Sequence, residues 1–199
     1  MTLAEAFLDV VSRVSTDLDV ENLRADVHAF STRHPDLTTR EKARRMVAST
    51  ARKAAALGAV ASLPPGWAAL ATMGPELSTL LVMQSRLILG LHLLYGGIPE
   101  PKERALEVLT GLASGAGISL GRRLSTRAAE EIAERLVIRI VGREATHIVP
   151  ILGAVAAAGL NYAAVRAVGH AAIRRVERLY GPPGIPGTGP VIDVPGAAA

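Results

Sequence analysis

The chain has no cysteine and few aromatic residues, and these two absences narrow the classes of protein it can belong to. Without cysteine it forms neither disulfide bonds nor thiolate metal sites, which fits a reducing compartment. Aromatic residues make up only 3% of the 199 residues, whereas β-sandwiches depend on aromatic and β-branched positions. Alanine, leucine, valine and glycine dominate instead, and they predict an all-α fold, a bundle of closely packed helices.

The chain also lacks a strong excess of either charge. The net charge is +4, from 22 basic and 18 acidic residues, and the two signs alternate along most of the sequence. No block resembles a basic nucleic-acid-binding arm, so no nucleic-acid partner is expected. The first residues lack the basic start of a secretory signal. We therefore expect a cytoplasmic protein that meets the cell membrane from its inner face.

Two long stretches contain almost no charge. Residues 54–99 carry only Glu76 and Arg86, and residues 146–165 carry none. Burying apolar surface yields ~25 cal/mol per Å², so protein or lipid must cover both stretches. Small residues recur four apart in the second stretch, as at Gly159 and Ala163, and this spacing predicts close approach of another helix.

Apolar spacing and capping signals predict the helices. Asp19 is a candidate N-cap, and Thr38 with Glu41 has the spacing of a capping box. Pro75 is expected to open a helix, and Gly111 to interrupt one. The predicted helices cover residues 3–15, 20–32, 38–63, 67–73, 76–95, 102–112, 126–142 and 150–180.

These elements predict three regions. Residues 1–53 form charged helices. Residues 54–180 form a helical core, in which a central apolar hairpin, residues 57–95, packs on the long Ala/Gly-rich C-terminal helix. Residues 181–199 are too rich in proline and glycine to fold and are expected to be disordered.

Glu76 and Arg86 are the candidate polar groups of the apolar hairpin. Glu76 is expected at a helix N-terminus, where the helix dipole favours a carboxylate. Arg86 lies about 15 Å further along the axis, so it needs a partner on another helix or a place at the membrane surface. An arginine at the centre of a lone span would cost ~2.5–3.5 kcal/mol. Arg86 could hold an anionic lipid headgroup or a carboxylate.

The remaining candidate binding residues are apolar or uncharged. Asn161 is expected to hydrogen-bond across to the hairpin, and Trp67 is either a membrane anchor or a core residue. A cavity between the uncharged segments would have Arg86 at its polar end and a lining of Leu80, Met83, Leu87, Leu91 and Ile151.

No pattern in the sequence predicts an enzyme, a metal site or a cofactor. Glu144 and His147 form the only Glu-x-x-His, whereas a di-iron site needs two such pairs. The glycines around residues 115–121 miss the dinucleotide pattern, and Ser114 lacks the flanking glycines of a nucleophile elbow. Isolated histidines such as His92 are expected to be packed or capping residues.

The order of several motifs resembles the EcsC family of bacterial proteins. These motifs are Pro64-Pro65-Gly66, Pro75-Glu76, Leu94-Tyr95-Gly96, the sequence VPILGA at residues 149–154, and Asn161. The resemblance covers residues 57–180. It implies a helical, membrane-associated protein without an established catalytic mechanism, and it carries over no catalytic residue.

The leading functional prediction is a non-enzymatic, membrane-associated helical protein that interacts with lipid or with a membrane or transport partner. Arginine-rich flanks at residues 40–53 and 166–178 would favour anionic lipid. The alternative is a soluble helical carrier that encloses an acyl or isoprenoid ligand.

Overall fold

A computed structural model of the chain describes residues 2–61, 67–118, 129–136 and 150–181, with the side chains of residue 3 and of residues 59–61, 67–78 and 150–157 excepted. Within these ranges every regular element is a helix, which confirms the all-α prediction. Residues 129–136 form a short helical segment. The longer helices are α1 (Leu3–Thr16), α2 (Val20–Thr32), α3 (Thr39–Ala61), α4 (Trp67–Leu94), α5 (Pro101–Gly115) and α7 (Pro150–Tyr180).

The first three helices begin at side-chain caps. The Asp19 carboxylate accepts a hydrogen bond from the Asn22 backbone N–H at 2.9 Å. At α3, the Thr38 backbone N–H donates to Glu41 Oε2 at 2.9 Å, and the Glu41 N–H donates to Thr38 Oγ1 at 3.3 Å. Both predicted caps are confirmed, because each supplies partners for N–H groups that the first turn leaves unpaired.

Two predicted helix breaks are wrong. α4 is continuous from Trp67 to Leu94 and passes through Pro75, so the two helices expected at residues 67–73 and 76–95 are one. α5 likewise continues through Gly111 to Gly115. A Cβ at Gly111 would lie 2.7 Å from Ile88 Cδ1, so this glycine provides space for the side chain of α4. At Gly111, tertiary packing outweighs the local helix-breaking tendency.

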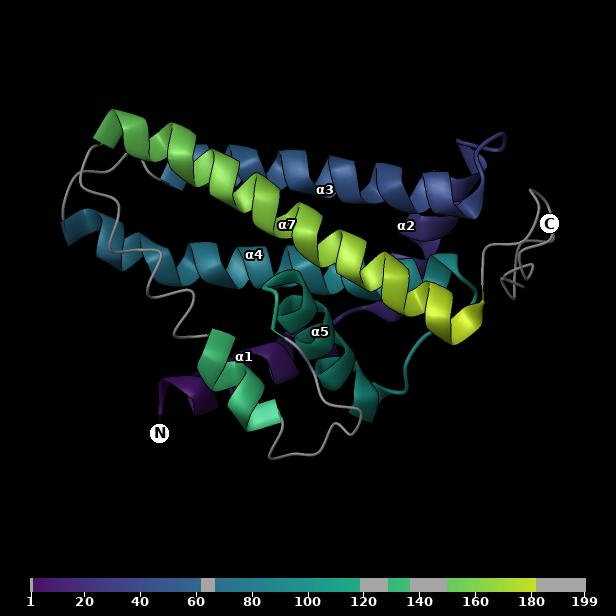
Figure 1. Cartoon of the computed structure of the whole chain (residues 1–199), viewed down its shortest axis with the longest axis horizontal. Helices are drawn as coiled ribbons and strands as arrows, with labels where there is room; N and C mark the ends of the chain where they lie inside the picture. Colours follow the sequence, from purple (N-terminus) through teal and green to yellow (C-terminus); the bar gives the residue numbers. More distant parts are fainter. Residues whose placement is uncertain (1, 62–66, 119–128, 137–149, 182–199) are drawn as a thin grey trace.

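The three longest helices, α3, α4 and α7, lie along the long axis of the molecule (Figure 1). At one end Arg40 of α3 pairs with Glu177 of α7, and about two turns further along α3, Val47 contacts Gly169. The residue numbers rise on α3 while they fall on α7, so these helices are antiparallel. α4 is antiparallel to α3 in the same way, with Gly90 against Met46.

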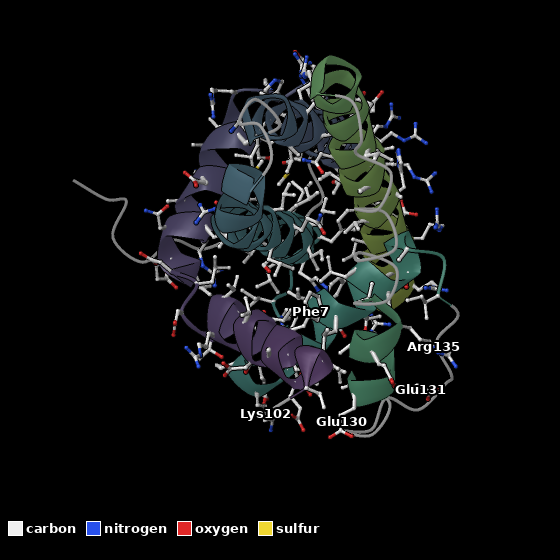
Figure 2. The ribbon with its side chains drawn as sticks, turned by 90° about the vertical axis from the view of Figure 1, so that its left-hand side faces the viewer. Phe7, Lys102, Glu130, Glu131 and Arg135 are labelled. Carbon is white, nitrogen blue, oxygen red and sulfur yellow. The ribbon has the colours of Figure 1, made fainter. Side chains whose placement is uncertain are left out.

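The hydrophobic core fills the space between α3, α4 and α7 and the shorter helices. The apolar hairpin predicted at residues 57–95, formed by the end of α3 and by α4, packs on α7 as expected. Figure 2 shows Phe7 of α1 directed toward the interior, whereas Glu130, Glu131 and Arg135 point outward. The largest fully buried apolar side chains are those of Val11, Val47, Ile88, Leu89, Leu91, Val108, Val165 and Val176.

Helix packing at Gly115 leads to the first prediction. A Cβ there would lie 2.6 Å from the Val168 Cα, a backbone atom that cannot rotate away. We expect Gly115→Ala to lower the free energy of unfolding by ~1–3 kcal/mol, the usual cost of overpacking, as measured by urea denaturation. The matched control is Gly159→Ala, because a Cβ at Gly159 would meet no atom within 4 Å. An equal loss in both variants would contradict this packing.

Candidate functional site

The charge-free halves of α3, α4 and α7 lie at one end of the molecule, on the left in Figure 1. We call this the apolar end and define it as residues 54–61 of α3, 67–85 of α4 and 150–165 of α7. Among these residues only Glu76 carries a formal charge. The antiparallel packing causes the arrangement, because α3 ends where α4 and α7 begin.

Apolar side chains lose their cover toward the apolar end. Leu87 and Leu91 on α4 are 2% and 0% exposed, while Leu80 and Met83, nearer the apolar end, are only partly buried against the core. Val82 on α4 and Leu160 on α7 are 38% and 37% exposed. They are two of the four large apolar side chains that are exposed in the described part of the chain; the others are Leu179 and Tyr180 at the opposite end of α7.

Of the two pairs of small residues expected to receive another helix, Gly153 with Ala157 lies outside the described side chains, and Gly159 with Ala163 does not serve this role. Gly159 and Ala163 are exposed, and the space around Gly159 is open to 4 Å. The close approaches of α7 occur instead at Gly169 against Val47 and at Val168 against Gly115. The expectation that Gly159 and Ala163 receive another helix of this chain is therefore wrong, and they leave an exposed apolar strip beside Leu160.

Four bases lie where the apolar end meets the charged remainder of the bundle. Gly90 lies against Met46, so Arg86, one turn earlier on α4, is level with residue 50 of α3. Gly169 lies against Val47, so Arg166 is level with the same part of α3. The next charged residues on α3 are Arg52 and Lys53, both exposed. We call Arg52, Lys53, Arg86 and Arg166 the basic collar.

Arg86 is expected to find a partner on another helix or to lie at the membrane surface. In the structure its partner is Asp26 of α2. Its Nη2 donates to Asp26 Oδ2 of α2 at 2.7 Å, and the two side chains are 35% and 63% exposed. The pair is at the surface, so its contribution to stability is about 0–1 kcal/mol. One edge of the Arg86 guanidinium is occupied by this carboxylate.

The structure places some of the other predicted site residues, whereas the side chains of others lie outside the described residues. Glu76 lies well inside α4, so the helix N-terminus expected there is wrong, and the dipole argument for its charge fails. Asn161 is partly buried on α7 and has an interaction partner. The side chains of Glu76, Trp67 and Ile151 lie outside the described residues, as do Glu144 and His147.

A buried polar network lies at the other end of the three long helices. His92, on α4, is 1% exposed; its Nδ1 is hydrogen-bonded to the Tyr180 hydroxyl at 2.9 Å. Its Nε2 lies 3.6 Å from Glu107 Oε2 on α5, and that carboxylate accepts two hydrogen bonds from Arg175 of α7, both of 2.5 Å. Burial lowers the pKa of His92, and the attraction of Glu107 only partly offsets this effect.

A second pair extends this network to α3. Glu177 accepts hydrogen bonds from Arg40 Nε at 2.7 Å and Nη2 at 2.8 Å, and Tyr95 donates to the same carboxylate at 3.2 Å. The Arg40 hydrogen bonds lower the pKa of Glu177, while burial raises that of Tyr95. Glu177 therefore favours its ionised form, and the hydrogen bonds and ion pairs of this region connect α3, α4, α5 and α7.

The isolated histidines His28, His92 and His170 are expected to be packed or capping residues; His92 is buried and His170 partly buried, whereas His28 is exposed. The partners of His92 were not predicted. Glu107 lies between apolar residues on α5, and Glu177 lies one residue from the buried Val176. Each acid occupies a position at which the helical pattern predicts a buried side chain. This unusual placement was the one sequence signal that could have indicated an ion pair there. The partners of these acids are 68 and 137 residues away, so spacing could not pair them.

Within the described ranges, no three histidine, aspartate or glutamate side chains are grouped as metal ligands would be. In those same ranges no helix combines the length and apolar character that a membrane crossing requires. Comparisons with protein-family profiles, with curated proteins and with solved structures find no match to this chain.

The lowered pKa of His92 predicts a pH-dependent stability. The unfolded chain, with an ordinary histidine pKa near ~6.5, binds the proton more readily than the folded chain. The free energy of unfolding should therefore fall as the pH falls from 7.5 to 5.5. We expect His92→Gln to show a smaller fall in urea denaturation. His28→Gln, at an exposed position on α2, is the control, and equal slopes in both variants would contradict this role of His92.

Proposed function

We propose that this is a non-enzymatic, membrane-associated protein whose apolar end enters one face of a lipid bilayer while the basic collar contacts anionic headgroups. The observation that supports it is the gathering of three nearly charge-free helix halves at one end of the bundle, bordered by four bases. Exposed apolar surface next to bases is the composition of an interfacial membrane anchor.

The length of the apolar end suits insertion from one side. At 1.5 Å of rise per residue, its part of α7 extends about 24 Å and its part of α3 about 12 Å. Its longest part, residues 67–85 of α4, extends about 28 Å. The hydrocarbon core of a bilayer is ~30 Å thick, so such an end would enter the core from one face without exceeding its thickness. The collar would then lie at headgroup level, where each well-placed base contributes ~1 kcal/mol on anionic lipid.

The resemblance to the EcsC family favours the same interpretation, because it implies a helical, membrane-associated protein; the inner face of the cell membrane is the side expected from the first residues, which lack the basic start of a secretory signal. The same resemblance motivates a membrane or transport protein as a further partner. The hypothesis thus has three parts, which we propose together: membership of the EcsC family, a location at the inner face of the cell membrane, and the absence of catalysis.

The soluble-carrier alternative has less support. It requires Leu87 and Leu91 to line a ligand cavity, whereas both are covered by the packed core. It also places Arg86 at the polar end of that cavity, and Arg86 is paired with Asp26 at the surface. Native mass spectrometry of the purified protein distinguishes the two, since a carrier would retain an acyl or isoprenoid molecule.

Flotation with vesicles tests the proposed function. We expect the wild-type chain to float with vesicles of phosphatidylcholine and phosphatidylglycerol, and less with phosphatidylcholine alone. Leu160→Asp should weaken this binding about tenfold, because a carboxylate would have to leave water. The matched control is Leu179→Asp, at an exposed position (52%, against 37% for Leu160) at the far end of α7. A wild-type chain that stays unbound, or equal effects of the two variants, would overturn the proposal.

Glu76 provides a second and opposite test. It is the one acid of the apolar end, so a bound state must either bury its charge or neutralise it. We expect Glu76→Gln to strengthen binding to the same vesicles by about fivefold or more. Glu103→Gln is the control, because it removes the same charge from an exposed position on α5. Stronger binding of both variants would indicate an effect of net charge alone.

A further inference from the structure

Three arginines and a histidine gather on the outer side of α3 and α7. Arg166, His170 and Arg174 follow one another at intervals of four residues along α7, so they share one face of the helix. Arg44 faces them from α3, because the contact of Gly169 with Val47 brings these parts of the two helices together. We call these four residues the basic cluster. Figure 2 shows nitrogen-tipped side chains along this outer side of α7.

Contacts along α7 hold part of the cluster in place. Arg166 Nη2 donates to His170 Nε2 at 3.3 Å, and Arg166 Nη1 donates to the Tyr162 hydroxyl at 3.3 Å. The guanidinium carbon also lies 5.7 Å from the centre of the Tyr162 ring. Arg166 is thus positioned by the helix that carries it, and its remaining donors are available to another group.

Among the described residues, the arginines of the cluster form no salt bridge with an acid, although Glu41 and Glu177 lie near enough to Arg44 for its charge to help lower their pKa values. The nearby acids are occupied elsewhere: Glu177 by Arg40, and Glu41 by Thr38. Burial lowers the pKa of His170, and the charges of Arg166, Arg174 and Arg44 lower it further. Like charges held close together destabilise the free protein, and an anion bound among them would relieve this repulsion.

We propose that Arg44, Arg166, His170 and Arg174 form a binding site for a phosphate monoester. A guanidinium presents two parallel N–H donors to phosphate oxygens, and a monoester carries about −1.5 to −2 charges near pH 7. The negative charge of a monoester therefore neutralises more of the positive charge of three arginines than the single charge of a phosphodiester does.

The site continues from the basic collar, with which it shares Arg166. From there Arg174 lies about 12 Å further from the apolar end, so the cluster begins at headgroup level and extends away from the membrane. The bound phosphate group could come from two sources. One is a lipid whose headgroup is a phosphate monoester, and the other is free phosphate in solution. Recognition of the lipid rests on the proposed function, whereas binding of free phosphate does not.

Flotation at equal surface charge tests the lipid source. We expect stronger binding to vesicles containing phosphatidic acid than to vesicles whose phosphatidylglycerol content gives the same surface charge. Arg44→Gln and Arg174→Gln should each reduce the binding to phosphatidic acid about fivefold and remove most of the preference. Arg45→Gln removes the same charge from the neighbouring exposed position of α3 and should retain the preference.

Titration with inorganic phosphate tests the site without vesicles. The imidazole resonances of His170, assigned by comparison with His170→Gln, should shift saturably at constant ionic strength and pH. The shift should weaken in Arg174→Gln and persist in Arg45→Gln. Saturable binding without any flotation would support the site for free phosphate and overturn the membrane proposal.

Two results would overturn the phosphate site. One is flotation with phosphatidylglycerol and phosphatidic acid to the same extent, together with no phosphate titration of His170; the membrane proposal would then stand alone. The other is an equal loss of preference in the Arg44, Arg174 and Arg45 variants, which would indicate unspecific attraction to charge.

Discussion

The antiparallel packing of α3 against α7 determines where the charges and the apolar surface of this molecule lie. The Arg40–Glu177 pair and the contact of Val47 with Gly169 set one register. With that register, the charged start of α3 meets the charged end of α7, and the two uncharged halves meet at the opposite end. In this register Arg52 and Lys53 of α3 lie level with residues 163–165 of α7, at the border of its uncharged segment. The separation of polar and apolar ends is therefore a consequence of helix packing.

The polar network around His92 complements this packing. Tyr180 and Glu107 give the buried His92 a hydrogen-bonded and an ionic partner, and Arg175 pairs with Glu107; burial of His92 without such partners would be costly. Because α3, α4, α5 and α7 all contribute, the network holds one end of the bundle in a single arrangement.

Much of the fold follows from local signals, and most of the candidate site does not. Asp19 and Thr38 start helices as their capping patterns predict, and α2 and α7 have the predicted ends. The break expected at Gly111 is wrong because its packing against Ile88 of another helix, which the local pattern does not reveal, favours a continuous helix. The break expected at Pro75 is also wrong, since α4 continues through it. The two uncharged stretches were found, but their common end depends on the register. Arg44 and His170 could not be paired from spacing, because they belong to different helices.

The level of the basic collar has a geometric consequence. Arg52, Arg86 and Arg166 belong to three different helices but lie at nearly the same height along the bundle. A plane drawn through them cuts the long axis at close to a right angle. If the apolar end is inserted into a negatively charged bilayer, a surface that contacts all three bases must meet the molecule end-on. The long helices are then nearly perpendicular to that surface. Three contacts on three different helices thus restrict the tilt of the bundle relative to that surface.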